Sequence, residues 1–94
     1  MASSKEYLEY VLELLRNVNN ISYKKMMGEY LLYCDNKLFG GIYDNRFLVK
    51  KNDVLAKYNL SEEIPYDNAK SMYLIDIEDS NKISEIVLEL VDRL

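Results

Sequence analysis

Histidine is absent from this 94-residue sequence, and its absence excludes the commonest catalytic and metal-binding arrangements. Nucleophiles paired with histidine and zinc sites built on histidine all need an imidazole ring. Cysteine is nearly absent too, because Cys34 stands alone and can form neither an internal disulfide nor a CxxC motif. This agrees with a reducing compartment. Since no histidine or pair of cations accompanies it, we expect Cys34 to be a buried, unreactive thiol.

Long apolar runs are also missing. No stretch approaches the ~18–20 apolar residues of a membrane-spanning helix, and Glu6 and Glu9 interrupt the N-terminal segment where a secretory signal would be apolar. We therefore expect a cytoplasmic protein that does not associate with membranes.

The formal net charge is -4, so an excess of basic residues is lacking as well. Nucleic-acid affinity depends largely on neutralising phosphates, and no direct nucleic-acid binding is expected.

Two short motifs resemble ligand sites, but their spacing favours a structural role. Gly40-Gly41 has no helix directly after it, as a phosphate cradle would, so we expect a bulge or a close backbone approach. Asp76, Glu78 and Asp79 lack the ligand spacing and the turn glycine of a calcium loop. We expect them to form a strand end and a helix cap. The sequence therefore predicts no catalytic residue, no metal and no cofactor.

The residues that are present are those of an ordinary globular protein. Hydrophobic residues make up 49% of the chain and charged residues 30%, which favours a folded chain over a disordered one. The length suits one domain, since domains run from ~50 to ~250 residues. No linker, repeat or low-complexity segment divides the sequence. We therefore expect a single domain over residues 1–94.

Two segments near the ends of the chain show the apolar spacing of helices. Ser3 and Glu6 form a capping box, and the helix that follows is expected to end near Asn17, within a run of asparagines. Asp79 or Ser80 is expected to cap the last helix. That helix carries the clearest apolar stripe in the chain: Ile83, Ile86, Val87, Leu90, Val91 and Leu94.

Residues 21–50 are organised as a meander of short strands. Gly28 predicts a bulge or a bend. Asp35-Asn36 and Asp44-Asn45 predict two-residue hairpin turns, because both residue types tolerate a positive φ. Between these breaks, four strands are expected: Ile21–Lys25, Tyr30–Cys34, Lys37–Tyr43 and Arg46–Lys50.

The two-residue turns would divide the strands into two apolar faces, because they pair Cys34 with Lys37 and Tyr43 with Arg46. The face expected to form the core holds Leu31, Tyr33, Leu38, Ile42, Phe47 and Val49. The opposite face holds Tyr30, Leu32, Cys34, Phe39, Tyr43, Arg46 and Leu48. Either the helices leave this second face open, as a partner-binding surface would be, or a helix or the Leu60–Lys70 segment covers it.

The rest of the chain completes an α+β fold. Asn52 or Asp53 is expected to cap a short middle helix through Tyr58. Leu60–Lys70, which contains the single proline, is expected to be a loop, and Met72–Ile77 alternates as a fifth strand. The expected architecture is one antiparallel sheet of about five strands with N-terminal, middle and C-terminal helices packed on it, in the order α-β-β-β-β-α-β-α.

A cluster of two lysines, two methionines and one carboxylate around the expected bend, in Tyr23–Tyr30, suggests a partner-binding edge, since methionine adapts to varied surfaces. The alternative is an edge strand that lysines protect, with a lysine–glutamate ion pair. Together with the second apolar face, this cluster gives the candidate partner-binding residues: Lys24, Lys25, Met26, Met27, Glu29, Tyr30, Leu32, Phe39, Tyr43 and Leu48.

Three segments, YKKMMGEYLLY, KLFGGIYDNRFLVK and PYDNAKSMYLID, resemble the N-terminal domain of the TfoX/Sxy competence-regulator family. The likeness extends over nearly the whole chain and is greatest to the short bacterial members that consist of this domain alone. It implies a domain with a central antiparallel sheet. It also implies kinship with proteins that help to switch on DNA-uptake genes together with a cyclic-AMP-dependent activator. The full-length regulators carry a second, helical domain, and the family offers no catalytic or ligand-binding residue to transfer.

These observations favour a non-enzymatic, cytoplasmic protein-interaction module that takes part in regulating competence or transcription. Its expected partner is another protein or a second copy of the chain. The alternative is a small-ligand-binding protein or an enzyme that uses a pocket lined by lysine and tyrosine, both of which can act as acid–base groups. A further alternative is a nucleic-acid accessory protein that uses a basic edge: Lys24, Lys25, Arg46, Lys50 and Lys51.

Overall fold

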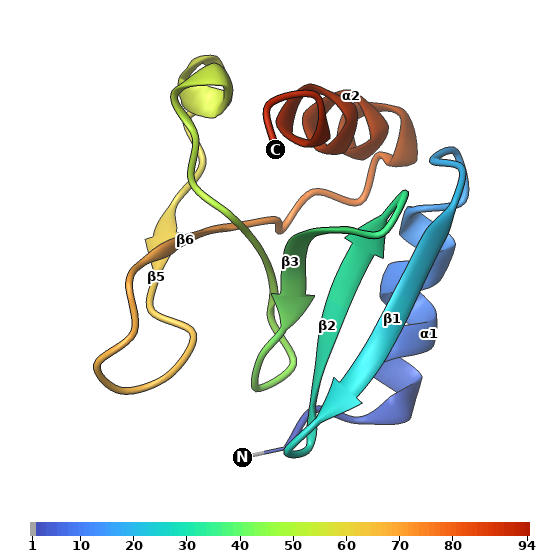
Figure 1. Cartoon of the computed structure of the whole chain (residues 1–94), viewed down its shortest axis with the longest axis vertical. Coiled ribbons are helices and arrows are strands. Elements are labelled where there is room, and N and C mark those ends of the chain that lie inside the picture. Colours follow the sequence, from blue (N-terminus) through green and yellow to red (C-terminus); the bar gives the residue numbers. More distant parts are fainter. Residues whose placement is uncertain (1) are drawn as a thin grey trace.

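The computed structural model describes residues 2–94, which form a six-stranded antiparallel sheet covered on one face by helices (Figure 1). The chain begins with α1 (Lys5–Leu14) and continues as a meander of four strands: β1 (Ile21–Met26), β2 (Glu29–Cys34), β3 (Lys37–Ile42) and β4 (Phe47–Val49). The second half contains one 3-10 helix, two short strands and a helix: η1 (Asp53–Tyr58), β5 (Glu62–Glu63), β6 (Met72–Leu74) and α2 (Ser80–Val91).

The sheet order is β1-β2-β3-β4-β6-β5, so the meander is extended by the later strands. The predicted α+β class, with its antiparallel sheet and terminal helices, is confirmed. The strand count is six because Glu62–Glu63, inside the predicted loop, pairs with β6. The predicted fifth strand is also shorter than expected and ends at Leu74.

Side-chain caps start the helices. The Oγ of Ser4 accepts a hydrogen bond from the backbone N–H of Tyr7 at 3.1 Å, so the cap lies one residue after the predicted Ser3. Asp79 caps α2 and Asn52 caps η1, each at a position that the sequence predicts. Helix α1 ends at Leu14, three residues before the predicted Asn17.

Two hairpin turns confirm the prediction from the Asp-Asn pairs. Both central residues of each turn have positive φ, between 50° and 65°. Cys34 lies opposite Lys37, as expected. Tyr43 and Arg46 exchange two backbone hydrogen bonds, of 2.9 and 3.0 Å. Local turn chemistry therefore sets the register at both ends of β3.

A bulge at Phe39 changes the register inside β3. Tyr33 lies opposite Leu38, but Leu32 lies opposite Gly40, so Phe39 has no partner in the ladder. Beyond this point β2 is shifted by one residue relative to β3, and such a shift reverses which side chains share a face.

This bulge corrects the predicted faces. Three residues expected in the core instead lie half-buried on the open face: Leu31, Tyr33 and Leu38. Four residues expected on the second face are buried in the core: Tyr30, Leu32, Cys34 and Phe39. The prediction is correct for Ile42, Phe47 and Val49, which belong to the core.

Gly40 and Gly41 allow the strands to approach closely here. A Cβ at Gly40 would lie 2.3 Å from the carbonyl oxygen of Leu48, and one at Gly41 would lie 2.7 Å from that of Tyr30. Neither distance is possible for a real side chain. The predicted close backbone approach is therefore confirmed.

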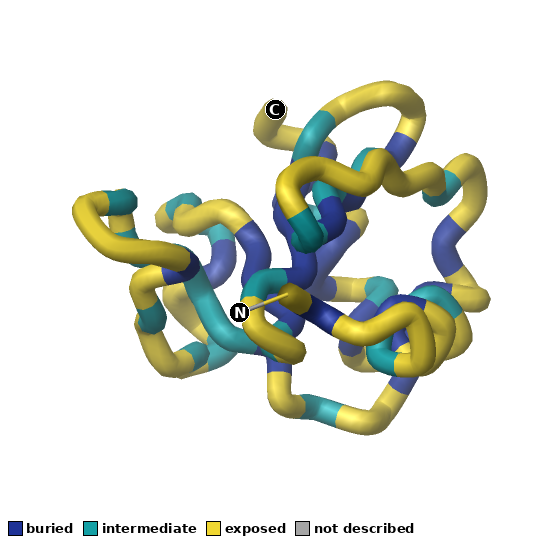
Figure 2. The backbone as a smooth tube through the Cα atoms, turned by 90° about the horizontal axis from the view of Figure 1, so that it is seen from below, coloured by how far each residue is buried: buried dark blue, intermediate teal, exposed yellow. Residues whose placement is uncertain are grey.

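The core lies between one face of the sheet and the helices, and Figure 2 shows buried backbone through the middle of the molecule. Helix α1 contributes Leu8, Val11 and Leu14, and α2 contributes the predicted stripe from Ile83 to Val91. Leu94 is 41% exposed and lies outside it. Among residues 2–94, no helix is long and apolar enough to cross a membrane.

Candidate interaction surface on the open face of the sheet

The face of the sheet opposite the helices carries a row of apolar residues that crosses its strands. Leu31 lies opposite Gly41, which lies opposite Leu48, and Leu48 lies opposite Leu74. Leu48 is fully buried but is not part of the helix-covered core. We call this side the open face, because no residue of α1 or α2 lines any of the three hollows described below.

The largest of these hollows lies beside the β1–β2 hairpin and has a volume of about 650 Å³. We call it the methionine hollow, and it is lined by Met26, Met27, Glu29, Leu31, Leu38, Tyr43 and Tyr66. Six of these seven side chains are apolar or aromatic. Its size and lining are typical of a cleft that accepts an apolar group.

Met27 stands at the rim of this hollow in an unfavourable conformation. Its φ is +53°, in the left-handed region that non-glycine residues rarely adopt, and its side chain is 96% exposed. Met27 and Gly28 together form a third two-residue turn, where the sequence predicts only a bulge or a bend. The fold thus holds a flexible apolar side chain in solvent at the tip of a hairpin.

Glu29 fixes the base of the same hairpin. Its carboxylate accepts hydrogen bonds from the hydroxyl of Ser3 at 2.6 Å and from the backbone N–H groups of Ser3 and Asp44, each at 3.0 Å. These bonds tie the N-terminal segment and the β3–β4 turn to the start of β2. The carboxylate forms no ion pair with Lys24 or Lys25 within residues 2–94, so the predicted lysine–glutamate pair is not present.

The loop between β5 and β6 borders the open face and lines its hollows. Arg46 holds it, donating to the carboxylate of Glu63 at 2.7 Å and to the carbonyl oxygens of Ile64 and Pro65 at 3.2 Å. The ring of Tyr66, from this loop, lies 6.1 Å from the ring of Tyr43. Tyr66 lines each of the three hollows described on this face, and Tyr43 lines the two larger ones.

Two further hollows adjoin Tyr66. The lysine hollow, about 480 Å³ in volume, is lined by Leu38, Gly40, Tyr43, Lys50, Lys51, Pro65, Tyr66, Ala69, Lys70, Ser71 and Met72. A smaller, polar hollow of about 450 Å³ is lined by Glu29, Asp44, Arg46, Ile64, Pro65, Tyr66, Asp67 and Asn68. The sequence left open whether the Leu60–Lys70 segment covers one side of the sheet, and four residues of that segment line the lysine hollow: Pro65, Tyr66, Ala69 and Lys70.

The structure separates the candidate partner-binding residues into two groups. Four are fully or almost fully buried and have no surface to offer a partner: Tyr30, Leu32, Phe39 and Leu48. Their assignment to an accessible face is therefore wrong, because the bulge at Phe39 places Tyr30, Leu32 and Phe39 in the core, whereas Leu48 is buried on the open face. The others lie on or beside the open face or on the edge strand β1: Lys24, Lys25, Met26, Met27, Glu29 and Tyr43.

Neither Cys34 nor the acidic residues form a reactive or metal-binding site in the described part of the chain. Cys34 is buried, as predicted, and burial raises the pKa of its thiol, with the charge of Asp35 adding to the shift. Among residues 2–94, no group of three or more potential protein ligands could hold a metal ion.

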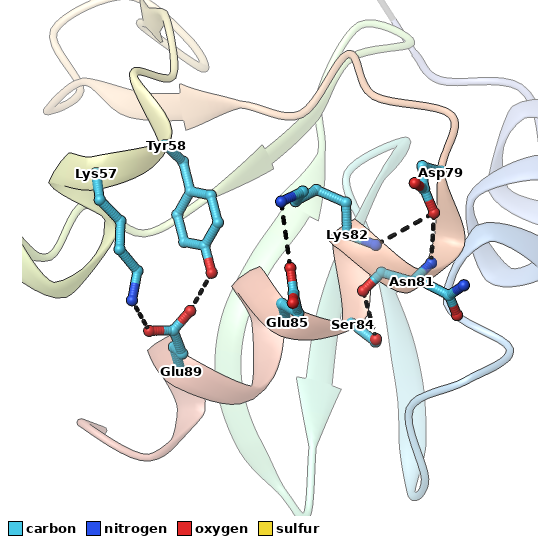
Figure 3. Close-up of polar contacts among 8 residues, drawn as sticks. All are labelled: Lys57, Tyr58, Asp79, Asn81, Lys82, Ser84, Glu85 and Glu89. Atoms are coloured by element: carbon cyan, nitrogen blue, oxygen red, sulfur yellow. Dashed lines mark hydrogen bonds and ion pairs between the residues drawn. The ribbon is translucent and has the colours of Figure 1, made fainter.

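The largest pKa shift lies away from the open face, where η1 meets α2 (Figure 3). The hydroxyl of Tyr58 donates to the carboxylate of Glu89, and this hydrogen bond raises the pKa of Tyr58 to about 12. Lys57 also donates to Glu89, at 2.5 Å, and these two bonds hold the pKa of Glu89 below its usual value. This cluster joins two elements of the scaffold.

Comparison with known proteins relates this sequence to one family and to one bacterial relative. The family model for the TfoX N-terminal domain matches residues 13–78. An "uncharacterized 12.7 kDa protein in trpE 5'region" from Spirochaeta aurantia is 30% identical over 91 residues, which cover 93% of this chain and 79% of that protein. The matched region contains the whole sheet and the loop that borders its open face. The chain belongs to the TfoX N-terminal domain family.

Proposed function

We propose that this chain is a non-enzymatic, cytoplasmic protein-interaction module that binds a partner protein on its open face. Met27 is the observation that carries this proposal. The left-handed conformation costs an L-residue roughly 1–2 kcal/mol. Because the side chain of Met27 is exposed, burial of apolar surface does not offset this cost. A side chain with that cost and no intramolecular role is best explained by contact with another molecule.

The surroundings of Met27 supply the rest of a binding site. The methionine hollow lies beside it, with Met26 and the rings of Tyr43 and Tyr66 in its wall. Aromatic and methionine side chains are enriched in protein interfaces, since they bury much area and adapt to a partner's shape. The positive charges of Lys24 and Lys25 lie on the adjacent edge strand and would guide an acidic partner.

Membership of the TfoX N-terminal domain family supports a regulatory use of such a module. We infer that the partner belongs to the machinery that controls transcription, and most specifically to the regulation of competence for DNA uptake.

Affinity capture from the source organism tests the proposal. The bait is the wild-type chain, a Met26→Ser/Met27→Ser double variant, or a Leu88→Ser control on α2, where Leu88 is also an exposed apolar residue. The partner found with wild type is purified and its Kd measured by titration calorimetry. We expect the double variant to weaken the Kd at least about tenfold and the control to leave it unchanged.

Two results would contradict the proposal. Equal binding of the wild-type chain and the double variant would place the interface elsewhere. A larger effect of Leu88→Ser would assign it to the helix layer. Light scattering of the purified chain distinguishes a second copy from a different protein, because only self-association makes the measured mass depend on the concentration of this chain alone.

A further inference from the structure

The lysine hollow has a chemistry of its own, distinct from that of the methionine hollow. Seven of its eleven lining residues are apolar, aromatic or glycine, and three of the other four are lysines. No carboxylate lines it. This is unexpected for a chain in which 16 acidic residues outnumber 12 basic ones. The hollow therefore concentrates positive charge on an acidic protein.

Across the whole chain, the negative charges are concentrated in the segments that contain the α-helices and the positive charges in the segment that contains the sheet. Segments 1–16 and 76–94, which include both α-helices, carry nine carboxylates and four cations. Residues 17–75, which include the whole sheet, carry seven carboxylates and eight cations. The field on the helix side would repel an anion, whereas the sheet side would not.

Two of the three lysines in the hollow are free to bind an anion. Lys51 is held by the carboxylate of Glu62 at 2.8 Å and by the hydroxyl of Ser71 at 3.2 Å. Lys50 and Lys70 are exposed and form no ion pair within residues 2–94. They line the hollow together with Leu38 and Gly40. Lysine suits this task as a compact charge on a long, adaptable stem.

The wall of the hollow can hold a flat apolar group. The rings of Tyr43 and Tyr66 lie 6.1 Å apart and are tilted by 50°, so they form an angled aromatic surface and not a closed stack. Pro65 and Met72 extend that surface beside them. A volume of about 480 Å³ lies within the range of small-molecule sites, which combine apolar walls with a few polar groups.

We propose that the lysine hollow binds a small organic anion. Its flat apolar body lies against Tyr43, Tyr66 and Leu38, and its carboxylate, sulfonate or phosphate group is held by Lys50 and Lys70. This site goes beyond the proposed protein-binding function and does not depend on it, because Met26 and Met27 do not line the lysine hollow.

The test uses 8-anilinonaphthalene-1-sulfonate, which combines a flat aromatic body with one anionic group. Its Kd is measured by fluorescence for wild type, for Lys50→Gln/Lys70→Gln, and for Lys24→Gln/Lys25→Gln. The last variant removes the same charge from β1, outside the hollow. We expect the first variant to weaken the Kd at least about fivefold and the second to leave it nearly unchanged. Thermal unfolding confirms that both variants are folded.

A neutral analogue without the sulfonate, N-phenyl-1-naphthylamine, isolates the contribution of charge. We expect it to bind more weakly than the sulfonate and with no difference between wild type and Lys50→Gln/Lys70→Gln. The proposal is overturned if the sulfonate fails to bind, if both double variants weaken it equally, or if the neutral analogue binds as tightly. The Met26→Ser/Met27→Ser variant should keep its affinity for the sulfonate, so failure of this site and failure of the protein-binding site are distinguishable.

Discussion

The ring of Tyr66 lies 6.1 Å from the ring of Tyr43, centroid to centroid, although the two residues belong to different hairpins of the sheet. Tyr43 precedes the β3–β4 turn, whereas Tyr66 belongs to the loop between β5 and β6. Both residues of the pair line the methionine hollow and the lysine hollow. It is therefore the feature that gives the open face its shape.

The Tyr66→Ala substitution should weaken binding of the naphthalene sulfonate far more than it lowers the free energy of unfolding. Tyr66 is 64% exposed, and an aromatic pair of this kind contributes no more than about 1 kcal/mol to the free energy of unfolding. Urea unfolding measures that loss, and fluorescence titration should show weaker binding of the naphthalene sulfonate. The control is Tyr23→Ala, which removes another exposed ring paired with a tyrosine, Tyr30 at 5.8 Å. If both variants change binding equally, the tyrosine pair does not shape the site.

Met27→Gly should stabilise the fold while removing an anchor for the partner. Glycine adopts a φ of +53° without steric cost, so we expect the free energy of unfolding to rise by about 0.5–1 kcal/mol. Asp44→Gly is the matched control, because Asp44 has the same φ of +53° but is a residue type that tolerates it. The control should gain less. A Met27→Gly variant that loses stability in urea unfolding would show that Met27 has an intramolecular role.

Gly40→Ala should destabilise the protein strongly. The added Cβ would lie 2.3 Å from the carbonyl oxygen of Leu48 and 3.0 Å from the Cα of Val49, and backbone atoms cannot rotate away as a side chain can. We expect a loss of at least about 2 kcal/mol in urea unfolding, since β3 and β4 must separate or the bulge must move. Ser22→Ala, on the exposed edge strand, should have little effect. A Gly40→Ala loss no larger than that of Ser22→Ala would contradict the packing described here.

Tyr58→Phe should lower the Tm by a few degrees at neutral pH, and this difference should depend on pH. The pKa of Tyr58 is raised in the folded state, so its contribution is complete below the ordinary pKa of about 10 and is lost as the pH rises through about 12. The pKa of Glu89 is lowered, so its contribution is present above about pH 4.5 and is lost as the pH falls.

Thermal unfolding at about pH 7 and about pH 3 measures this difference most simply. The gap between wild type and Tyr58→Phe should shrink at the lower pH, because protonated Glu89 accepts hydrogen bonds less strongly. Tyr23→Phe serves as the control, since the hydroxyl of Tyr23 makes no hydrogen bond to the described residues. A Tm difference between wild type and Tyr58→Phe that stays constant between the two pH values would contradict a stabilising hydrogen bond from Tyr58 to Glu89.

Local chemistry predicted the elements of this fold well, and nonlocal pairing is where prediction from sequence failed. The Asp-Asn turns, the asparagine and aspartate caps and the apolar stripe of α2 each depend on a few consecutive residues. The bulge at Phe39 depends on how β2 and β4 fit beside Gly40, which is not visible along β3 alone. One unpaired residue was enough to exchange the faces of β2.

The candidate site was predicted only in part, because one of its walls also depends on contacts between residues far apart in the sequence. The methionines at positions 26 and 27 and the neighbouring Tyr43 stood out by residue type. The opposite wall, from Ile64 to Met72, comes from a loop that Arg46 holds through two carbonyl oxygens and a carboxylate. No periodicity in that loop indicates where it lies. The lysine hollow therefore became visible only in three dimensions.

Site-specific photo-crosslinking tests the central claim, that the open face is the binding surface, most directly. A benzoylphenylalanine is placed at position 27 in one variant and at position 88, on the helix side, in another, and both are expressed in the source organism. We expect a discrete adduct from position 27, which is lost when Tyr66→Ala is added, and no adduct from position 88. An adduct from position 88 alone, or from neither position under conditions where the wild-type chain captures its partner, would contradict it.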